Sequence, residues 1–312
     1  MILTVTMNPS IDMAYALDHL KIDDVNRVSD VRKTAGGKGL NVTRVIHLMS
    51  QPVKATGVLG GNFGKFIEDQ LDNDSIQHSF THINQETRNS IAILHDGGKQ
   101  TELLEAGPTL SGADAQAFLD HFDALLDETN LVTMSGSLPG GLAPSFYSEL
   151  VAHAAQKGIK VLLDTSGASL AAAVKSEHKP FLIKPNDEEL GNLLGEKVDR
   201  TDLPKLQQQL QDPRFDGIDW VVVSLGSKGA FAKHGNKFYQ AAIPKINAVN
   251  PVGSGDSTIA GLAMALAQDK DDATVLKTAM ACGLLNTLEA TTGFVNPDHF
   301  DEYFNQVTVT EK

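Results

Sequence analysis

The chain has 312 residues, of which 41% are hydrophobic and 21% charged, a composition typical of folded globular proteins that excludes a disordered chain. With 26 basic and 39 acidic residues the net charge is −13, so no nucleic-acid partner is expected. No apolar run reaches the about 18 residues of a membrane span, and Met1–Val5 lacks the basic start of a signal peptide.

The single cysteine, Cys282, excludes an internal disulfide and any site built from several cysteines. It fits a reducing, cytoplasmic location, and we expect it to be a small buried residue of an apolar helix.

Short runs of aliphatic and β-branched residues alternate with amphipathic helical stretches along most of the chain. The strand runs are continuously apolar, which is typical of strands covered on both faces. This order predicts an α/β fold with a doubly wound, mainly parallel sheet and helices on both faces, in which ligands bind beyond the carboxyl ends of the strands. The predicted strands are 2–6, 56–59, 131–134, 161–163, 181–183 and 220–223, and the predicted helices are 41–49, 63–71, 113–126, 146–156, 188–194 and 257–267.

Two regions, at about residues 12–34 and 88–106, interrupt this rhythm with patterns typical of antiparallel β-ribbons. We expect them to form one small sheet that protrudes from the main domain. A small sheet with one apolar face must cover that face, and a ligand, the main domain or a second copy of the chain could do so.

Two glycine-rich segments precede predicted helices. Gly36-Gly37-Lys38-Gly39 opens the helix over 41–49, and Asn250-Pro251-Val252-Gly253-Ser254-Gly255-Asp256 opens the helix over 257–267. Free N–H groups at a helix start bind anions, and a carboxylate beside them suits phosphoryl transfer to a hydroxyl. The alternatives are a flexible turn for the first segment and an acidic residue that complements the helix dipole for Asp256.

Two further segments follow predicted strands. The first is Lys184-Pro185-Asn186-Asp187-Glu188-Glu189. It forms either a polar cluster near Mg²⁺ and the nucleotide phosphates or only a capping box between Asn186 and Glu189. Ser224-Leu225-Gly226-Ser227-Lys228-Gly229 either contacts a phosphate or adenosine group or is an ordinary glycine-rich turn.

Together with Ser135-Gly136-Ser137-Leu138-Pro139, these four segments occur in an order that resembles the PfkB, or ribokinase-like, carbohydrate kinases over essentially the whole chain. Thr6-Met7-Asn8-Pro9-Ser10-Ile11-Asp12 and Glu86-Thr87-Arg88-Asn89 resemble the branch that acts on hexose phosphates. The resemblance implies one kinase domain over residues 1–312 with a lid inserted from about 12–34 and 88–106. It also implies ATP and Mg²⁺ as cofactors and a homodimer formed through the lid sheets.

The activity implied is ATP-dependent phosphorylation of a ketohexose phosphate, with D-tagatose 6-phosphate as the first candidate and D-fructose 1-phosphate as the alternative. A non-catalytic sugar-phosphate sensor and a nucleoside kinase remain open. Asn250, followed by Pro251, stands where the family commonly has an aspartate, so the resemblance does not extend to a monovalent-cation site at this loop.

The resemblance assigns a role to each matching residue. Asp256 would be the general base and Gly253, Ser254 and Gly255 the anion hole. The sugar phosphate would contact Asp12, Arg27, Gly36, Gly37, Lys38, Asn41, Arg88 and Ser137. The nucleotide would contact Lys184, Asn186, Ser224, Gly226, Lys228, Gly229 and Asn286, with Asn186 and Glu189 indirectly associated with Mg²⁺. Each cation could instead be an ordinary solvated surface charge.

Overall fold

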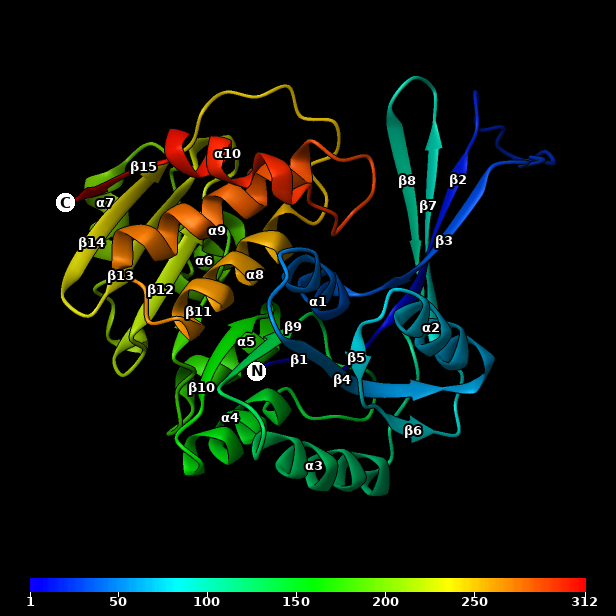
Figure 1. The fold of residues 1–312 in the computed structure, drawn as a ribbon, viewed down its shortest axis with the longest axis horizontal. Coiled ribbons are helices and arrows are strands. Elements are labelled where there is room, and N and C mark those ends of the chain that lie inside the picture. The colour runs from blue at the N-terminus through cyan, green and yellow to red at the C-terminus, as the bar shows by residue number, and fades with distance from the viewer.

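A computed structural model describes residues 1–312 as a large, mainly parallel sheet between two layers of helices, with a second, smaller sheet beside it (Figure 1). The large sheet has 11 strands in the order β15-β14-β13-β12-β11-β10-β9-β1-β4-β5, and β6 also pairs with β4. Its parallel part runs from β12 to β5, and β13, β14 and β15 add an antiparallel edge. The predicted fold class is therefore confirmed.

The strands of the large sheet have these bounds: β1 Ile2–Thr6, β4 Val53–Gly60, β5 Gln77–His78, β6 Thr81–Ile83, β9 Leu131–Ser135, β10 Lys160–Asp164, β11 Leu182–Ile183, β12 Trp220–Ser224, β13 Ala230–His234, β14 Lys237–Ala242 and β15 Thr308–Glu311. The helices are α1 Lys38–Leu48, α2 Gly61–Asn73, α3 Gly112–Leu126, α4 Phe146–Gln156, α5 Gly167–Lys175, α6 Asp187–Leu194, α7 Leu203–Gln209, α8 Ser254–Ala267, α9 Asp272–Thr287 and α10 Phe300–Gln306.

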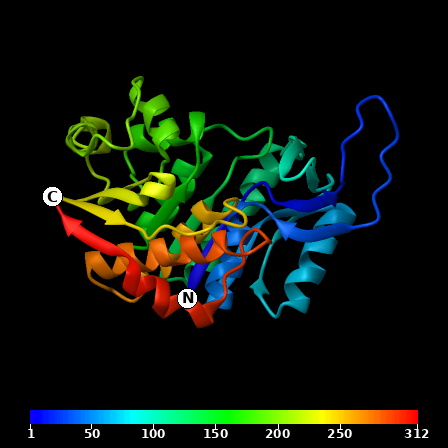
Figure 2. The same ribbon diagram turned by 90° about the horizontal axis from the view of Figure 1, so that it is seen from above.

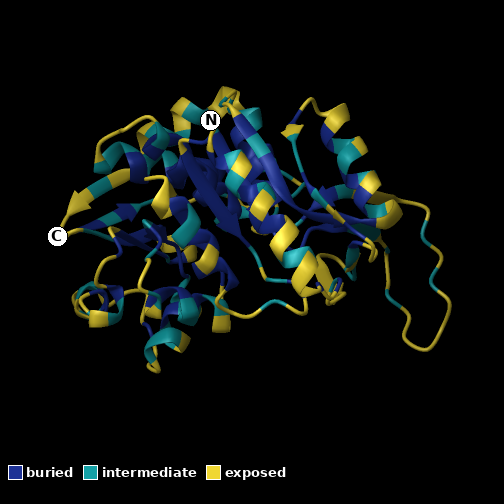
Figure 3. Cartoon of the chain, turned by 90° about the horizontal axis from the view of Figure 1, so that it is seen from below, coloured by how far each residue is buried: buried dark blue, intermediate teal, exposed yellow.

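Successive side chains of the central strands enter two separate cores, one on each face of the sheet. In β12, Val221 and Val223 pack with α3 to α6, whereas Trp220 and Val222 pack with α1, α8 and α9. Figure 3 shows these strands as the most buried part of the chain. Because both faces are covered, the strands are apolar throughout, as the sequence predicted.

The smaller sheet has the order β3-β2-β7-β8, with β2 Ser10–Ala16, β3 Val31–Gly36, β7 Arg88–His95 and β8 Lys99–Leu104. The pairs β2–β3 and β7–β8 are antiparallel, as predicted. The two ribbons are joined by a parallel pairing of β2 with β7, which the antiparallel pattern did not predict. A third core, which includes Ile11, Leu40 and Ile67, joins this sheet to α1 and α2.

The loops that leave the carboxyl ends of β1, β9, β11 and β12 carry four of the segments singled out in the sequence, at residues 6–12, 135–139, 184–189 and 224–229. Because parallel strands end at the same edge, these segments meet there, as expected for a doubly wound sheet. Cys282 is buried in α9. No helix combines the length and the apolar character needed to cross a membrane.

Candidate active site

Asp256 lies in the first turn of α8 and is only 6% exposed. The residue before the helix, Gly253, has φ of 85°, a left-handed conformation that favours glycine. The Nδ2 group of Asn41, in α1, donates a hydrogen bond of 2.8 Å to Asp256 Oδ2. The two glycine-rich segments, far apart in the sequence, therefore meet at one buried carboxylate.

Backbone N–H groups are available beside this carboxylate. The N–H groups of Gly253, Gly255 and Asp256 have no acceptor in the protein, whereas that of Ser254 donates to Pro251 at 3.3 Å. Together with the positive end of the helix dipole, the three free groups can bind an anion. The N–H groups without an acceptor are thus those of Gly253, Gly255 and Asp256 and not that of Ser254, while the anion hole over 253–255 stays a prediction.

Asn286, predicted to contact the nucleotide, lies fully buried beneath this loop. Its Nδ2 group donates to the carbonyl of Val252 at 2.8 Å, and its Oδ1 atom accepts from the N–H of Gly293 at 2.8 Å and from the Ser257 hydroxyl at 3.2 Å. These bonds hold the loop in shape. Asn286 therefore supports the loop, and its contact with the nucleotide stays a prediction.

Two lysines and a second carboxylate surround Asp256. Lys184 and Asp164 form a buried ion pair of 3.3 Å at the ends of β11 and β10. A Cβ atom built on Gly255 would lie 3.3 Å from Lys184 Nζ. This ammonium group therefore reaches residues 250–256, which we call the anion loop. Lys38, at the start of α1, remains exposed, and the carboxylate of Asp164, ahead of that of Asp256, raises its pKa. Both lysines therefore carry positive charge beside the loop.

Burial raises the pKa of Asp256 from 3.8 to about 6, and the charge of Asp164 adds to this rise. Lys38, the hydrogen bond from Asn41 and Lys184 act in the opposite direction. A carboxyl group with this pKa is ionised at neutral pH but basic enough to accept a proton, which is what a general base needs.

Asp12, in β2 of the small sheet, lies beside Gly36 and Gly37 at the start of α1. Burial raises its pKa, and the Ser10 hydroxyl donates a 2.7 Å hydrogen bond to its Oδ1 atom. A Cβ atom on Gly36 would lie 2.0 Å from Asp12 Cγ, so only glycine leaves room for this carboxylate. The requirement for Gly36 thus comes from Asp12 itself, while Gly37 has φ of 104° at the start of α1.

Arg88 begins β7, and burial lowers its pKa while the negative charges of Asp12 and Glu105 act against this lowering. Its Nε group donates to the Asn8 carbonyl and its Nη1 group to the Glu105 carbonyl, both at 3.2 Å. The Nη2 group has no partner in the protein. The exposed Ser137 accepts a 3.4 Å hydrogen bond from Asn8 Nδ2. Arg88 and Ser137 are therefore brought to one place by Asn8.

Asn186 and Glu189 form the capping box that the sequence offered as an alternative. Asn186 Oδ1 accepts from the Glu189 N–H at 2.8 Å, and Glu189 Oε2 accepts from the Asn186 N–H at 2.9 Å. This leaves Glu189 Oε1 for another partner, and the buried Asp164 Oδ2 atom also has none. No group of three histidine, cysteine or acidic side chains could hold a metal by itself. One or two carboxylates fit Mg²⁺, which binds largely through phosphates and water.

The segment from Ser224 to Gly229 forms a short 3₁₀ turn after β12, and Ser224 bridges to Asn186. Gly226 and Gly229 have φ of 57° and 87°. A Cβ on Gly229 would lie 2.0 Å from the Ala241 carbonyl oxygen, so packing alone requires this glycine. Lys228 is exposed and makes no ion pair with the protein.

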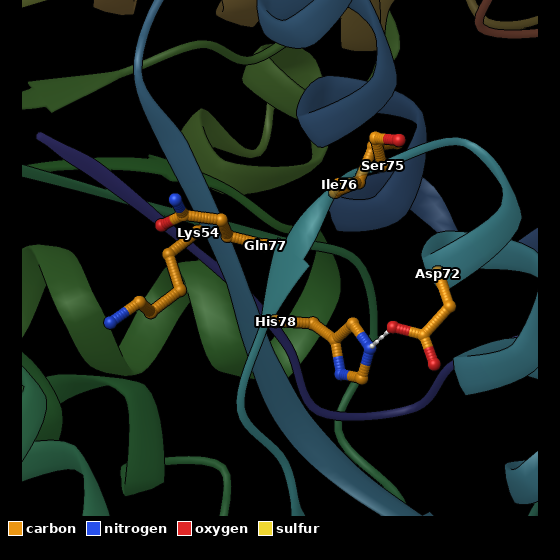
Figure 4. A pocket seen from close by; sticks show the side chains of 6 residues that line it. All are labelled: Lys54, Asp72, Ser75, Ile76, Gln77 and His78. Atoms are coloured by element: carbon orange, nitrogen blue, oxygen red, sulfur yellow. Dashed lines mark hydrogen bonds and ion pairs between the residues drawn. The ribbon is translucent and has the colours of Figure 1, made fainter.

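Arg27 is not brought to the other cations within this chain. It lies in the exposed segment between β2 and β3, which extends away from the main body (Figure 2). A surface hollow lined by Lys54, Asp72, Ser75, Ile76, Gln77 and His78 also lies apart from the site (Figure 4). None of the predicted site residues lines that hollow, whose Asp72 and His78 pair at 3.1 Å.

Sequence reasoning missed two residues of this site, Asp164 and Arg44. Asp164 directly follows the predicted strand 161–163, and that position at a carboxyl strand end was a usable signal. Arg44 lies in α1, is 5% exposed and contacts Asn41. Nothing in the local pattern distinguishes this arginine from a surface cation.

The buried Asp256 carboxylate should cost stability at neutral pH. Its folded pKa of about 6 lies above the ordinary 3.8, so ionisation opposes folding by about 3 kcal/mol above pH 6. We expect Asp256→Asn to raise the melting temperature at pH 8. The gain in the free energy of unfolding at pH 5 should be about half the gain at pH 8. Thermal unfolding at both pH values checks this, and an unchanged melting temperature at pH 8 would contradict it.

Solved structures similar to this chain are sugar kinases and phosphofructokinases. A candidate phosphofructokinase from Staphylococcus aureus is 31% identical, with a TM-score of 0.86 over 100% of this chain and 99% of that one. Phosphofructokinase-2 from Escherichia coli, in complex with potassium, is 24% identical, with a TM-score of 0.88 over 97% and 98% of the two chains. A candidate 1-phosphofructokinase from Thermotoga maritima is 23% identical, with a TM-score of 0.84 over 100% and 99%.

Residues 5–299 match the pfkB family of carbohydrate kinases. This match covers the anion loop, the buried carboxylate, the small sheet and the large sheet apart from β15 and the start of β1. The chain thus belongs to the PfkB carbohydrate kinase family and is a phosphotransferase with an alcohol group as acceptor.

Proposed function

We propose that the protein transfers the γ-phosphoryl group of ATP to the C1 hydroxyl of D-tagatose 6-phosphate, giving D-tagatose 1,6-bisphosphate and ADP. The observation that carries this proposal is the buried Asp256, held by Asn41 beside unpaired N–H groups at the start of α8. A base and an anion site in one place are what phosphoryl transfer to a hydroxyl requires.

In the proposed reaction, Asp256 accepts the proton of the C1 hydroxyl while that oxygen forms a bond to the γ-phosphorus. The bond between the γ-phosphorus and the oxygen that bridges to the β-phosphate breaks, and ADP leaves with the electron pair. The free N–H groups of Gly253 and Gly255 and the ammonium of Lys184 bind the negative charge of the transferring group. Catalysis then consists mainly of positioning and electrostatics.

Carbohydrate kinases of this family use ATP, typically with Mg²⁺. When bound, Mg²⁺ would supply positive charge that neutralises the nucleotide phosphates. The unpartnered Asp164 Oδ2 atom and Glu189 Oε1 are the groups we propose to hold it, directly or through water. Ser224, Gly226, Lys228 and Gly229 would contact the nucleotide from the turn after β12.

The cations among the residues proposed to bind the sugar support a substrate that already carries a phosphate. Arg88 lies in β7 and keeps one N–H group without a partner. The family resemblance assigns Lys38, in α1 beside the anion loop, to the same phosphate group. A nucleoside would leave these charges without use. Fructose 1-phosphate is the second candidate substrate, favoured by the fold shared with the Thermotoga maritima protein described as a candidate 1-phosphofructokinase.

We propose that residues 1–312 form one kinase domain in which the small sheet acts as a lid, and that two copies associate through these sheets. Exposed apolar side chains on the small sheet support this: Val31, Leu94, Leu103 and Leu104. In such a dimer, Arg27 would reach the sugar phosphate from the protruding segment, which extends beyond the main body of its own chain. Phosphofructokinase-2 from Escherichia coli has a tetrameric inhibited form. A cytoplasmic location agrees with the lone buried cysteine.

Removing the base should abolish most turnover. We expect Asp256→Asn to lower kcat by about 10²–10⁴-fold, because general-base catalysis has this magnitude. ADP release measured with a coupled assay at saturating substrates checks it. Asp298→Asn is the control, since this exposed carboxylate precedes α10 and should leave kcat unchanged. A fall of less than about tenfold for Asp256→Asn would contradict the base role.

Removing the Arg88 guanidinium should weaken sugar-phosphate binding selectively. A lost charge-assisted hydrogen bond predicts that Arg88→Ala raises KM for the sugar phosphate by about 10–100-fold, with KM for ATP nearly unchanged. Arg88→Lys, which keeps the charge, should show a smaller rise. Lys99→Ala, at an exposed position of β8, is the control. Equal rises in both KM values would count against the assignment.

Substrate preference decides between the candidate functions. We expect kcat/KM to be highest for D-tagatose 6-phosphate in a panel with D-fructose 6-phosphate, D-fructose 1-phosphate and adenosine, each measured by ADP release. The highest value for fructose 1-phosphate would establish the second candidate, and turnover of adenosine alone would establish a nucleoside kinase. Binding of a sugar phosphate by calorimetry without any turnover would instead identify a sensor.

A further inference from the structure

Arg44 is a buried cation that none of the proposed catalytic steps uses. It lies in α1, one turn after Asn41, and its side chain is only 5% exposed. Burial lowers its pKa, and the charges of Asp74 and Asp12 act against this lowering. A buried guanidinium group destabilises the fold unless its N–H groups have hydrogen-bond acceptors, so the contacts of Arg44 indicate its role.

The guanidinium group binds three acceptors from three separate parts of the chain. Nη1 donates to Asn41 Oδ1 at 3.2 Å and lies 3.5 Å from the Thr292 carbonyl oxygen, and Nη2 donates to the carbonyl of Ala35 in β3. Its central carbon lies 5.2 Å from the centre of the Phe294 ring. Arg44 therefore connects the small sheet, α1 and the loop after α9.

The contact with Asn41 fixes which end of that amide faces the base. Because Asn41 Oδ1 accepts from a cation that cannot accept in return, its Nδ2 group must be the end that points to Asp256. A rotated amide would place Oδ1 against the carboxylate and leave both oxygens without a donor. The network thus permits one orientation only.

We propose that Arg44 is a positioning residue that locks the Asn41 amide so that it donates to Asp256 and keeps this carboxylate ionised and correctly aimed. The consequence for turnover rests on the proposed function, whereas the consequence for the charge state of Asp256 does not. Arg44 acts through Asn41, since no contact joins Arg44 to Asp256.

The other charged groups that face Asp256 come from different elements. Lys38 in α1 and Lys184 after β11 favour its ionised form, and Asp164 at the end of β10 disfavours it. None of these three groups hydrogen bonds with Asn41 or Arg44. A change at Arg44 should therefore reach Asp256 through the hydrogen bond from Asn41, which lowers the pKa of Asp256.

The test is the titration of Asp256 in the free enzyme, followed by the ¹³C shift of its carboxyl carbon, with no substrate present. We expect Arg44→Met to raise the pKa of Asp256 by about half a unit or more, the range of a lost hydrogen bond to a carboxylate. Asn41→Ala should raise it by a similar amount, and the double variant should add little to either. The acidic limb of kcat/KM should move by the same interval.

Arg32→Ala is the matched control. Arg32 is also a cation that joins the small sheet to the loop after α9, through a 2.9 Å hydrogen bond from Nη1 to Thr291 Oγ1, but it does not contact Asn41. We expect it to leave the pKa of Asp256 unchanged. If Arg44→Met does not fold, Arg44→Lys replaces it, because one ammonium group cannot reach both Asn41 and Ala35 with the same geometry.

An Arg44 variant that melts at lower temperature but keeps the pKa of Asp256 would show a merely structural role and overturn the inference. So would an unchanged pKa in Asn41→Ala. A shifted pKa in a protein without any kinase turnover would support the positioning role while rejecting the proposed function, so the two failures are distinguishable.

Discussion

The hydrogen bond between Asn41 and Asp256 is the contact on which the site depends. It joins the first helix of the chain to the eighth across 215 positions of sequence. It also gives a donor to a carboxylate that burial would otherwise tend to neutralise. Because the carboxylate lies at the start of a helix with unpaired N–H groups, the same contact holds the carboxylate beside donors that can bind an anion.

The site contains several positively charged side chains although the whole protein is strongly acidic. The chain carries a net charge of −13, yet Lys38 and Lys184 lie beside the anion loop and Arg88 lies near Asp12. The buried pair of Lys184 with Asp164 keeps one of these cations in place without solvent. Local cations of this kind are required before phosphate groups can enter so acidic a molecule.

The sequence predicted the parallel sheet and most of its helices because continuous apolar strands and one-sided helices leave clear patterns. It predicted an apolar helix around Cys282 but not the bounds of α9, because α9 packs between α8 and α10 and is apolar on more than one side, with no single stripe. The parallel pairing of β2 with β7 depends on how two distant ribbons leave the main sheet, and no local pattern records that. Asp164 could have been found from its place at a strand end, whereas the burial of Arg44 follows only from packing.

Several residues of the family motifs serve the fold and the site at once. Asn186 and Glu189 cap α6, Gly229 makes room for Ala241, and Gly36 makes room for Asp12. A substitution at any of them would change local structure before it changed chemistry, so loss of activity there does not identify a catalytic group. Asp256 differs, because its burial opposes folding at neutral pH and no packing need explains a charge at that position. A charged group that the fold would be more stable without is what we expect of a residue with a chemical role.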